Sequence, residues 1–236
     1  MDFAGAYSAE NLQFLLEGLY FTLLVAVASI ALSFLFGCIV GVIRYMRLPV
    51  LSPVLLVAVE LIRNLPLLLI IFFMRFALPE IGIKLGLVSA TITGLTIFEA
   101  AMIAEIVRGG LASIDKGQIE AARSSGLSSL QTLWHIVLPQ GLRRMVPPLV
   151  SQFISLLKDT SLAVVISLPE LMHNAGIVIG HGYAYTIPIL LLVALIYFTV
   201  NFFAVPRFQT VGGPARINLT LTRRGMEGIG AVPEIW

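Results

Sequence analysis

The feature that most constrains this chain is a long stretch without charge. No charged residue occurs between Gly18 and Ile43, and roughly 20 apolar residues in an α-helix cross the hydrocarbon core of a bilayer. The whole chain has the same character, with 58% apolar and 12% charged residues, whereas soluble domains average about 45–50% and about 25%. The sequence therefore predicts an integral membrane protein.

Further apolar segments extend this to about five transmembrane helices. The expected spans are 14–43, 52–77, 85–112, 140–162 and 184–206. The segments are apolar all round and lack the alternation of a membrane β-barrel strand. The predicted fold class is all-α, a polytopic membrane helix bundle. Residues 1–206 would form the transmembrane domain, and 207–236, rich in Gly and Pro, an irregular cytoplasmic tail.

The placement of Lys and Arg orients the spans, because short cytoplasmic loops carry an excess of both. The basic residues gather after the first span, between the third and fourth spans, and after the last. This pattern predicts an outside N-terminus and an inside C-terminus. The residues before the first span are acidic and include no Lys or Arg, which is unlike a secretory signal peptide. The basic residues flank spans and are not interleaved with exposed aromatic residues, so we expect no nucleic-acid partner.

The polar segment 113–139 predicts a helical hairpin between the third and fourth spans. Asp115 with Gln118, and Ser128 with Gln131, each have the spacing of a capping box at a helix start. The segment should therefore contain two short helices, and we refer to residues 113–139 as the hairpin.

Gly126 lies where the first of these helices would close in a left-handed conformation. We expect that helix to expose Glu120, Ala121 and Ala122. The second helix has apolar residues at the spacing of a single face, namely Leu130, Leu133, Trp134 and Val137. From the residues alone, packing beneath the protein's own helices and docking to a partner are equally good explanations of the hairpin.

The hairpin resembles the cytoplasmic signature loop, or EAA loop, of ABC importer permeases. The matching residues are Glu120-Ala121-Ala122, then Gly126 after three residues, then Ile136-Val137-Leu138-Pro139 after nine more. The resemblance implies the type I ABC importer permease fold, in which this loop forms coupling helices that fit a groove on the ATPase subunit. It assigns the ATPase-coupling contact to Glu120, Ala121, Ala122, Gly126 and Leu127.

Three other segments, 63–68, 104–110 and 157–162, are similar to the polar amino acid subfamily of these permeases, and the likeness extends over about residues 8–203. The subfamily members that it most resembles carry glutamate, glutamine or aspartate. The resemblance implies a multi-pass protein of the bacterial inner membrane that imports such an amino acid by alternating access. The tail departs from the family pattern.

The chain has no phosphate-binding P-loop sequence, so ATP hydrolysis is expected on a separate chain. The resemblance implies three partners: an ABC ATPase subunit that binds ATP and Mg, a second permease copy or paralogue, and an extracytoplasmic amino acid binding protein. This chain itself would be a transport subunit, without enzyme activity or a bound cofactor.

Lys158, Asp159, Thr160 and Ser161 are the first candidates for the substrate path. A charge near the middle of the membrane costs at least ~2.5–3.5 kcal/mol on insertion scales, so it is retained when it is paired or functional. Pro169 interrupts the chain a few residues later, and a discontinuous helix there could bind the charged groups of an amino acid. Alternatively, the two charges pair with each other or lie in water at the outer end of the fourth span.

Glu99, inside an apolar span, is the second candidate, the alternative being a carboxylate paired to a helical neighbour or to an Arg of another span. Glu60 with Arg63 and Glu105 with Arg108 have i, i+3 spacing. We expect both to be structural ion pairs.

Other kinds of function have less support. The three His residues are scattered and no Cys or carboxylate cluster joins them at metal-ligand spacing, so no metal site is expected. A membrane hydrolase would need a nucleophile motif that the chain lacks. The remaining alternative is a stand-alone secondary transporter or channel that uses its intramembrane carboxylates.

Overall fold

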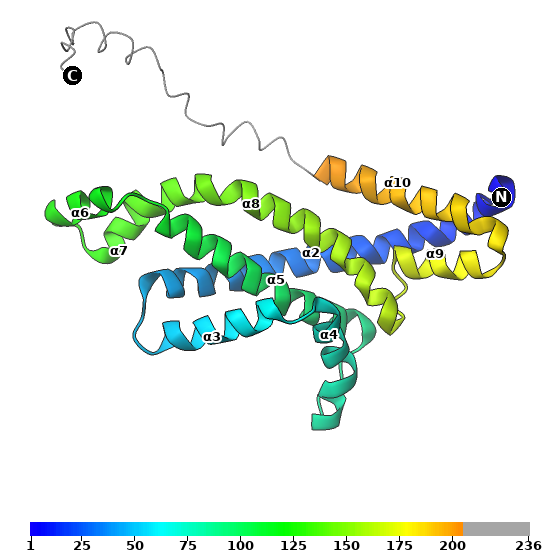
Figure 1. Ribbon diagram of the computed structural model, residues 1–236, viewed down its shortest axis with the longest axis horizontal. Coiled ribbons are helices and arrows are strands. Elements are labelled where there is room, and N and C mark those ends of the chain that lie inside the picture. Colours follow the sequence, from blue (N-terminus) through cyan, green and yellow to red (C-terminus); the bar gives the residue numbers. More distant parts are fainter. Residues whose placement is uncertain (205–236) are drawn as a thin grey trace, which may run out of the picture.

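The computed structural model describes residues 1–204, and within them every regular element is helical. The predicted tail 207–236 and the end of the last predicted span lie outside the described residues. The α-helices are α1 (Phe3–Ala6), α2 (Ala9–Met46), α3 (Leu51–Asn64), α4 (Leu67–Phe72), α5 (Leu87–Ala112), α6 (Lys116–Ser124), α7 (Ser129–Thr132), α8 (Leu138–Asp159), α9 (Leu171–Gly180) and α10 (Thr186–Ala204). They form one elongated bundle, with α6 and α7 at one end of the long axis and the N-terminus at the other (Figure 1).

The predicted count of about five spans agrees with the helices. Four helical segments are long and apolar enough to cross a membrane, and α3 with α4 make a fifth if the bent pair counts as one span. The first, α2, has 38 residues, which at 1.5 Å per residue is about 57 Å, well beyond the ~30 Å hydrocarbon core. It begins at Ala9, before the predicted residue 14. At this start the Ser8 side chain accepts a hydrogen bond from the backbone N–H of Asn11 and caps the helix.

The second predicted span, 52–77, is not a single straight helix. Between α3 and the helical segment after it, the chain bends by 103°. The bend occurs at Leu65, which is extended at φ −88° and ψ 144°, because Pro66 disfavours a helical conformation in the residue before it. As a result, the chain turns away from the long axis of the bundle at α4 (Figure 1), which still packs on α5 through Leu67 and Ile71.

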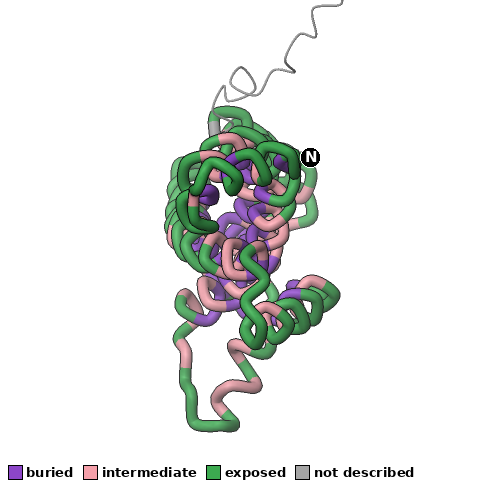
Figure 2. The backbone as a smooth tube through the Cα atoms, turned by 90° about the vertical axis from the view of Figure 1, so that its left-hand side faces the viewer, coloured by how far each residue is buried: buried purple, intermediate pink, exposed green. Residues whose placement is uncertain are grey.

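The centre of the bundle is the packing of α2 against α5, the third predicted span. Small residues let the two backbones approach closely. A Cβ added at Gly41 would lie 2.7 Å from the carbonyl oxygen of Ala104, and one at Gly37 would lie 2.6 Å from the side chain of Ile103. The buried residues run along the middle of the bundle and exposed ones surround them (Figure 2).

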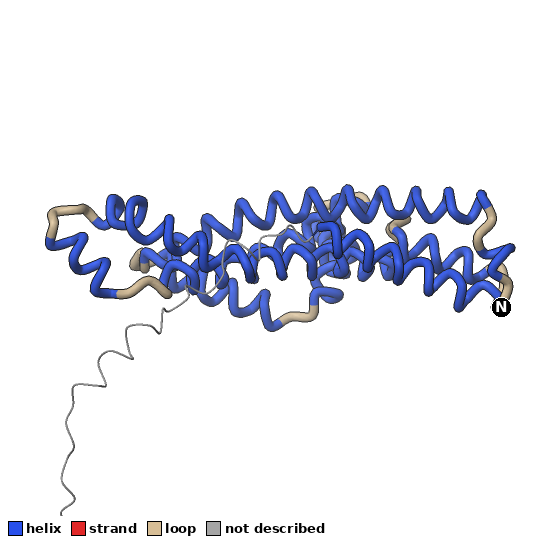
Figure 3. Tube along the Cα trace, turned by 90° about the horizontal axis from the view of Figure 1, so that it is seen from above, coloured by secondary structure: helices blue, strands red, loops and turns tan. Residues whose placement is uncertain are grey.

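The chain after α5 differs from the prediction in two places. The fourth apolar helical segment runs from Ser129 to Ile166 and so extends beyond the predicted 140–162. Within it, α8 begins at Leu138 and ends at Asp159, after which Thr160–Ile166 continue as a tighter 3₁₀-helix. The second difference is α9, a short apolar helix that the sequence pattern does not separate from the last span. Its end lies near the start of α10, so α9 and α10 run side by side (Figures 1 and 3).

Candidate functional site

The hairpin projects beyond the end of α2 (Figures 1 and 3). We call this end of the bundle the hairpin end. Asp115 caps α6 as predicted, its carboxylate accepting from the backbone N–H of Gly117 at 2.8 Å. Gln118 does not complete a capping box, because its side-chain oxygen instead accepts from the amide of Gln140 on α8 at 2.7 Å. This hydrogen bond ties the hairpin to α8.

The turn between α6 and α7 has the predicted geometry. Gly126 is left-handed at φ +89°, and its N–H donates to the carbonyl of Arg123 at 3.0 Å, while that of Leu127 donates to Ala122 at 3.2 Å. These two bonds form a Schellman motif. The capping box of Ser128 and Gln131 is present, with reciprocal bonds of 2.8 and 3.2 Å. The hairpin is therefore internally braced.

The exposed surface of the hairpin differs in part from the prediction. Glu120 and Ala121 are exposed, as expected, but Ala122 is buried. The predicted apolar face of the second helix is also split: Leu133 and Val137 are buried, whereas four residues apart Leu130 is 54% and Trp134 59% exposed. Leu133 and Val137 belong to a π-helical segment, Leu133–Val137, and pack against residues of α5 and α8. The hairpin thus exposes two large apolar side chains as well as Glu120 and Ala121.

Glu105 forms an ion pair with Arg108, as predicted, and with a second arginine that was not predicted. Its Oε2 atom is 2.7 Å from Nη1 of Arg44 on α2, and both of its carboxylate oxygens accept from the guanidinium of Arg108. The Arg44 side chain is 4% exposed. The carboxylate therefore joins α2 to α5 just above the hairpin.

Glu60 and Arg63 also form the predicted ion pair, at 3.1 Å. The preceding residue, Val59, packs on Ala101 and Ala104, which are 11 and 8 residues before the end of α5. This corresponds to about 12–17 Å along the helix. The pair is thus at the end of α3 but beside the middle part of α5, away from the hairpin end of that helix.

Glu99 is completely buried where α5 packs on α8. One carboxylate oxygen accepts from Nε2 of Gln152 at 2.8 Å, and the other has no partner within the described residues. The expected alternatives were a backbone group or an arginine, and neither is its partner. Asp159 lies seven residues after Gln152, two turns along the same face of α8. That face of α8 thus carries polar groups toward α5.

The four predicted residues at the end of α8 do not form one cluster. Lys158 is exposed and lines a shallow pocket of about 340 Å³ with Tyr197 and Asn201 of α10. Asp159 is half-buried, and the two do not form an ion pair with each other. Thr160 is buried and donates to the carbonyl of Leu157, while Ser161 donates to that of Lys158, both at 2.7 Å. Both hydroxyls therefore bond their own helix.

A buried polar network around Glu170 was missed. Its carboxylate caps α9, accepting from the backbone N–H groups of Met172 and His173 at 2.8 and 2.7 Å, and the Tyr197 hydroxyl donates to it at 3.4 Å. A signal was available in Pro169, which interrupts a helix just before the uncharged segment from Leu171 to Pro206.

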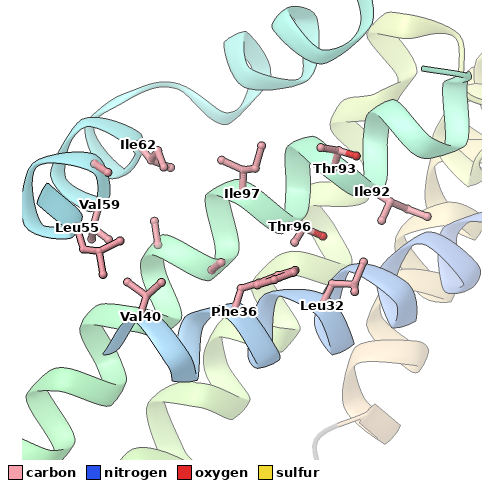
Figure 4. A pocket seen from close by; sticks show the side chains of 13 residues that line it. Leu32, Phe36, Val40, Leu55, Val59, Ile62, Ile92, Thr93, Thr96 and Ile97 are labelled. Carbon is pink, nitrogen blue, oxygen red and sulfur yellow. The ribbon is translucent and has the colours of Figure 1, made fainter. Parts of the chain in front are cut away.

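An apolar groove of about 390 Å³ lies between α2, α3 and α5 (Figure 4). Its only polar side chains are Thr93 and Thr96. A polar amino acid could not satisfy its charged groups there, so the groove is excluded as the substrate path. No group of His, Cys, Asp or Glu side chains within residues 1–204 is arranged to hold a metal ion.

Comparison with known proteins shows which family has this architecture. Residues 30–209 match the family described as binding-protein-dependent transport system inner membrane component. The probable glutamine ABC transporter permease protein GlnP of Bacillus subtilis (strain 168) is 68% identical over 204 residues, which cover 86% of this chain and 94% of GlnP. The glutamate transport system permease protein GluD of Corynebacterium glutamicum is 37% identical over 192 residues, covering 80% of this chain and 70% of GluD.

A solved structure, described as the crystal structure of an amino acid ABC transporter with histidines, superimposes with a TM-score of 0.81 at 26% identity. The match covers 90% of this chain and 98% of the other. Sequence and fold agree, and the chain belongs to the family of binding-protein-dependent transport system inner membrane components.

Proposed function

We propose that this chain is the permease subunit of an ATP-binding-cassette importer that carries a polar amino acid, with glutamine as the first candidate. The support for the substrate is the name of the relative with 68% identity, a probable glutamine permease. A second relative, the probable glutamine ABC transporter permease protein GlnM of Bacillus subtilis (strain 168), is 42% identical over 172 residues. Glutamate and aspartate are the next candidates.

The observation that carries the proposal is the braced, projecting hairpin. Its two helix starts are capped, its turn is a Schellman motif and its base is bonded to α8. The exposed Glu120 and Ala121, with Gly126 and Leu127 at the turn, would contact the ATPase. Ala122 is buried, so it would support this surface from inside the hairpin and would not touch the ATPase itself. A rigid hairpin of this kind would transmit a movement of the ATPase to α5 and α8, whereas a flexible loop would absorb that movement.

We assign the substrate path to the polar groups between α5 and α8. Glu99 has one carboxylate oxygen without a partner in the described chain, and Asp159 follows on the same face of α8 as Gln152. A carboxylate that can accept from an ammonium group suits the amino end of an amino acid. Thr160 and Ser161 would contribute backbone groups at the change from α-helix to 3₁₀-helix. Lys158 would act from the other side of α8, toward α10.

The proposed assembly contains other chains. An ATPase subunit binds ATP and Mg and docks on the hairpin, a second permease copy or paralogue completes the passage, and an external binding protein delivers the amino acid. In this arrangement the hairpin end is cytoplasmic, in agreement with the distribution of Lys and Arg, and the N-terminus is outside, with the cell membrane of a bacterium as the location.

The test is uptake into proteoliposomes that contain the chain with its ATPase and binding protein. We expect labelled glutamine to accumulate only with ATP inside, on the ATPase side. The same uptake measurement on a panel of the other amino acids ranks the substrates. Uptake that persists with a proton gradient alone, without ATP or ATPase, would overturn the proposal in favour of a stand-alone transporter.

A further inference from the structure

A second pocket, of about 530 Å³, lies at the hairpin end. It is lined by the end of α2, the end of α5 and the inner side of the hairpin. Its position is where the spans stop, since α2 ends at Met46 and α5 at Ala112. The pocket is of the size that small ligands occupy, and neither the proposed substrate path nor the exposed coupling surface uses it.

The charged residues that line this pocket all have the same sign. They are Arg44, Arg47, Arg108, Lys116 and Arg123. The one acidic group in direct contact with any of them within residues 1–204 is Glu105, which bonds Arg44 and Arg108. Arg47 and Lys116 are exposed, and their side chains form no hydrogen bond or ion pair in the same part of the chain. The pocket therefore has a surplus of positive charge.

Arg44 gives the second observation. Its side chain is only 4% exposed, and its Nε–H, although buried, has no acceptor in the described part of the chain. A buried donor without a partner costs about 1–3 kcal/mol. The Nε–H itself is closed to solvent, so an acceptor in the pocket would reach it, and remove this cost, after a shift of the Arg44 side chain, which is among the residues that line the pocket.

The rest of the lining is mostly apolar and includes Tyr45, Ile119 and Leu133, with the hydroxyl side chains of Ser129 and Thr132 beside them. Cations beside apolar side chains, at the level where spans end, match a phospholipid, whose phosphate is joined to hydrocarbon. Basic pockets between helices at such a level bind anionic headgroups in membrane proteins. Free phosphate shares the charge but would leave the apolar part of the lining without a partner.

We propose that this pocket binds the phosphate of an anionic phospholipid, held by Arg44, Arg47 and Lys116. Bound there, the lipid would bridge α2 and the hairpin, because Arg47 comes directly after the first and Lys116 begins the helix of the second. The left-handed Arg47, at φ 54°, ends α2 beside the pocket. The lipid would thus brace the hairpin against the first span.

The test is a lipid titration of the purified full chain in detergent, followed by native mass spectrometry. The probes are phosphatidylglycerol and phosphatidylcholine with identical acyl chains. Each Lys or Arg near an anionic lipid contributes about fivefold in affinity, so the double variant Arg47→Gln, Lys116→Gln should bind phosphatidylglycerol about 25-fold more weakly. Arg143→Gln is the matched control, because Arg143 is also exposed near the same end but does not line the pocket.

The expected result is a preference for phosphatidylglycerol that the double variant loses, that the control retains and that the charge-conserving variant Arg47→Lys, Lys116→Arg restores. Equal binding of the two lipids, or an unaffected double variant, would overturn the proposal. Displacement of phosphatidylglycerol by inorganic phosphate alone would identify a free anion as the ligand instead. If the double variant lost the ATPase subunit during purification but kept the lipid, the cations would belong to the protein interface.

Discussion

The substitution Glu105→Gln tests how α2 and α5 are joined. Glutamine keeps the size of the side chain and its ability to accept a hydrogen bond, but it removes the negative charge between two arginines. Arg44, 2.7 Å from the carboxylate and 4% exposed, would then be a buried cation without a counterion. Arg108 has a side chain that is 38% exposed, so the loss of its counterion would cost much less free energy.

Removing one partner of a buried ion pair costs about 3–5 kcal/mol, because it leaves an uncompensated buried charge. Glu105 itself is 24% exposed, so the lower limit, about 3 kcal/mol, applies. In a chain of this size each kcal/mol lowers the melting temperature by about 2–4 °C, which predicts a decrease of about 6–12 °C. The matched variant Arg108→Gln leaves the Arg44 pair intact and breaks a partly exposed one, at a cost of about 0–1 kcal/mol and less than about 4 °C.

The measurement is thermal unfolding of the purified full chain in one detergent, for wild type, Glu105→Gln and Arg108→Gln. The ratio of the two decreases is the informative quantity, because the detergent affects all three proteins alike. Equal decreases for the two variants, or a larger one for Arg108→Gln, would refute the reasoning that burial of Arg44 sets the cost.

Three further outcomes follow from the geometry. Gly126→Val should reduce uptake per ATP hydrolysed, because a left-handed backbone costs a branched residue at least about 1–2 kcal/mol, whereas Gly126→Asn should retain coupling; equal coupling in both would contradict the role of the turn. Glu99→Gln keeps the hydrogen bond to Gln152 and should reduce uptake at least about tenfold without lowering the melting temperature; wild-type uptake would make Glu99 purely structural. Gly41→Leu should overpack the interface, lower the free energy of unfolding by about 1–3 kcal/mol and so lower the melting temperature. Gly176→Leu, whose new side chain would meet open space, should leave the melting temperature unchanged; similar melting temperatures for the two variants would argue against close α2–α5 contact.

Much of the hairpin could be predicted because its structure is local. Caps and a glycine turn depend on residues within five positions of one another. The predictions failed where a distant residue competed. Gln118 bonds Gln140 of α8 and so leaves Asp115 to cap alone. Leu133 and Val137 pack against residues of α5 and α8, whereas Trp134 stays exposed.

The candidate site shows the same division. Spacing of three residues predicted that Glu60 would meet Arg63 and that Glu105 would meet Arg108, and both pairs are present. It could not predict that Arg44, 61 residues away, would join Glu105. Nor could it predict the amide of Gln152 as the partner of Glu99, because that contact depends on the packing of α5 against α8.

By itself, the sequence determined the membrane location, the helical class, the number of spans and the hairpin. Each of these follows from run length or short-range spacing, and lipid as solvent leaves few alternatives to a helix for an apolar run. Pro66 and Pro169 are local signals for the bend between α3 and α4 and for the separate helix α9, although the predicted spans did not use them. Only the tertiary structure decided where α4 and α9 pack and which partners the buried charges have. These depend on which helices become neighbours, and the exact packing of one helix on another has no signature within either helix alone.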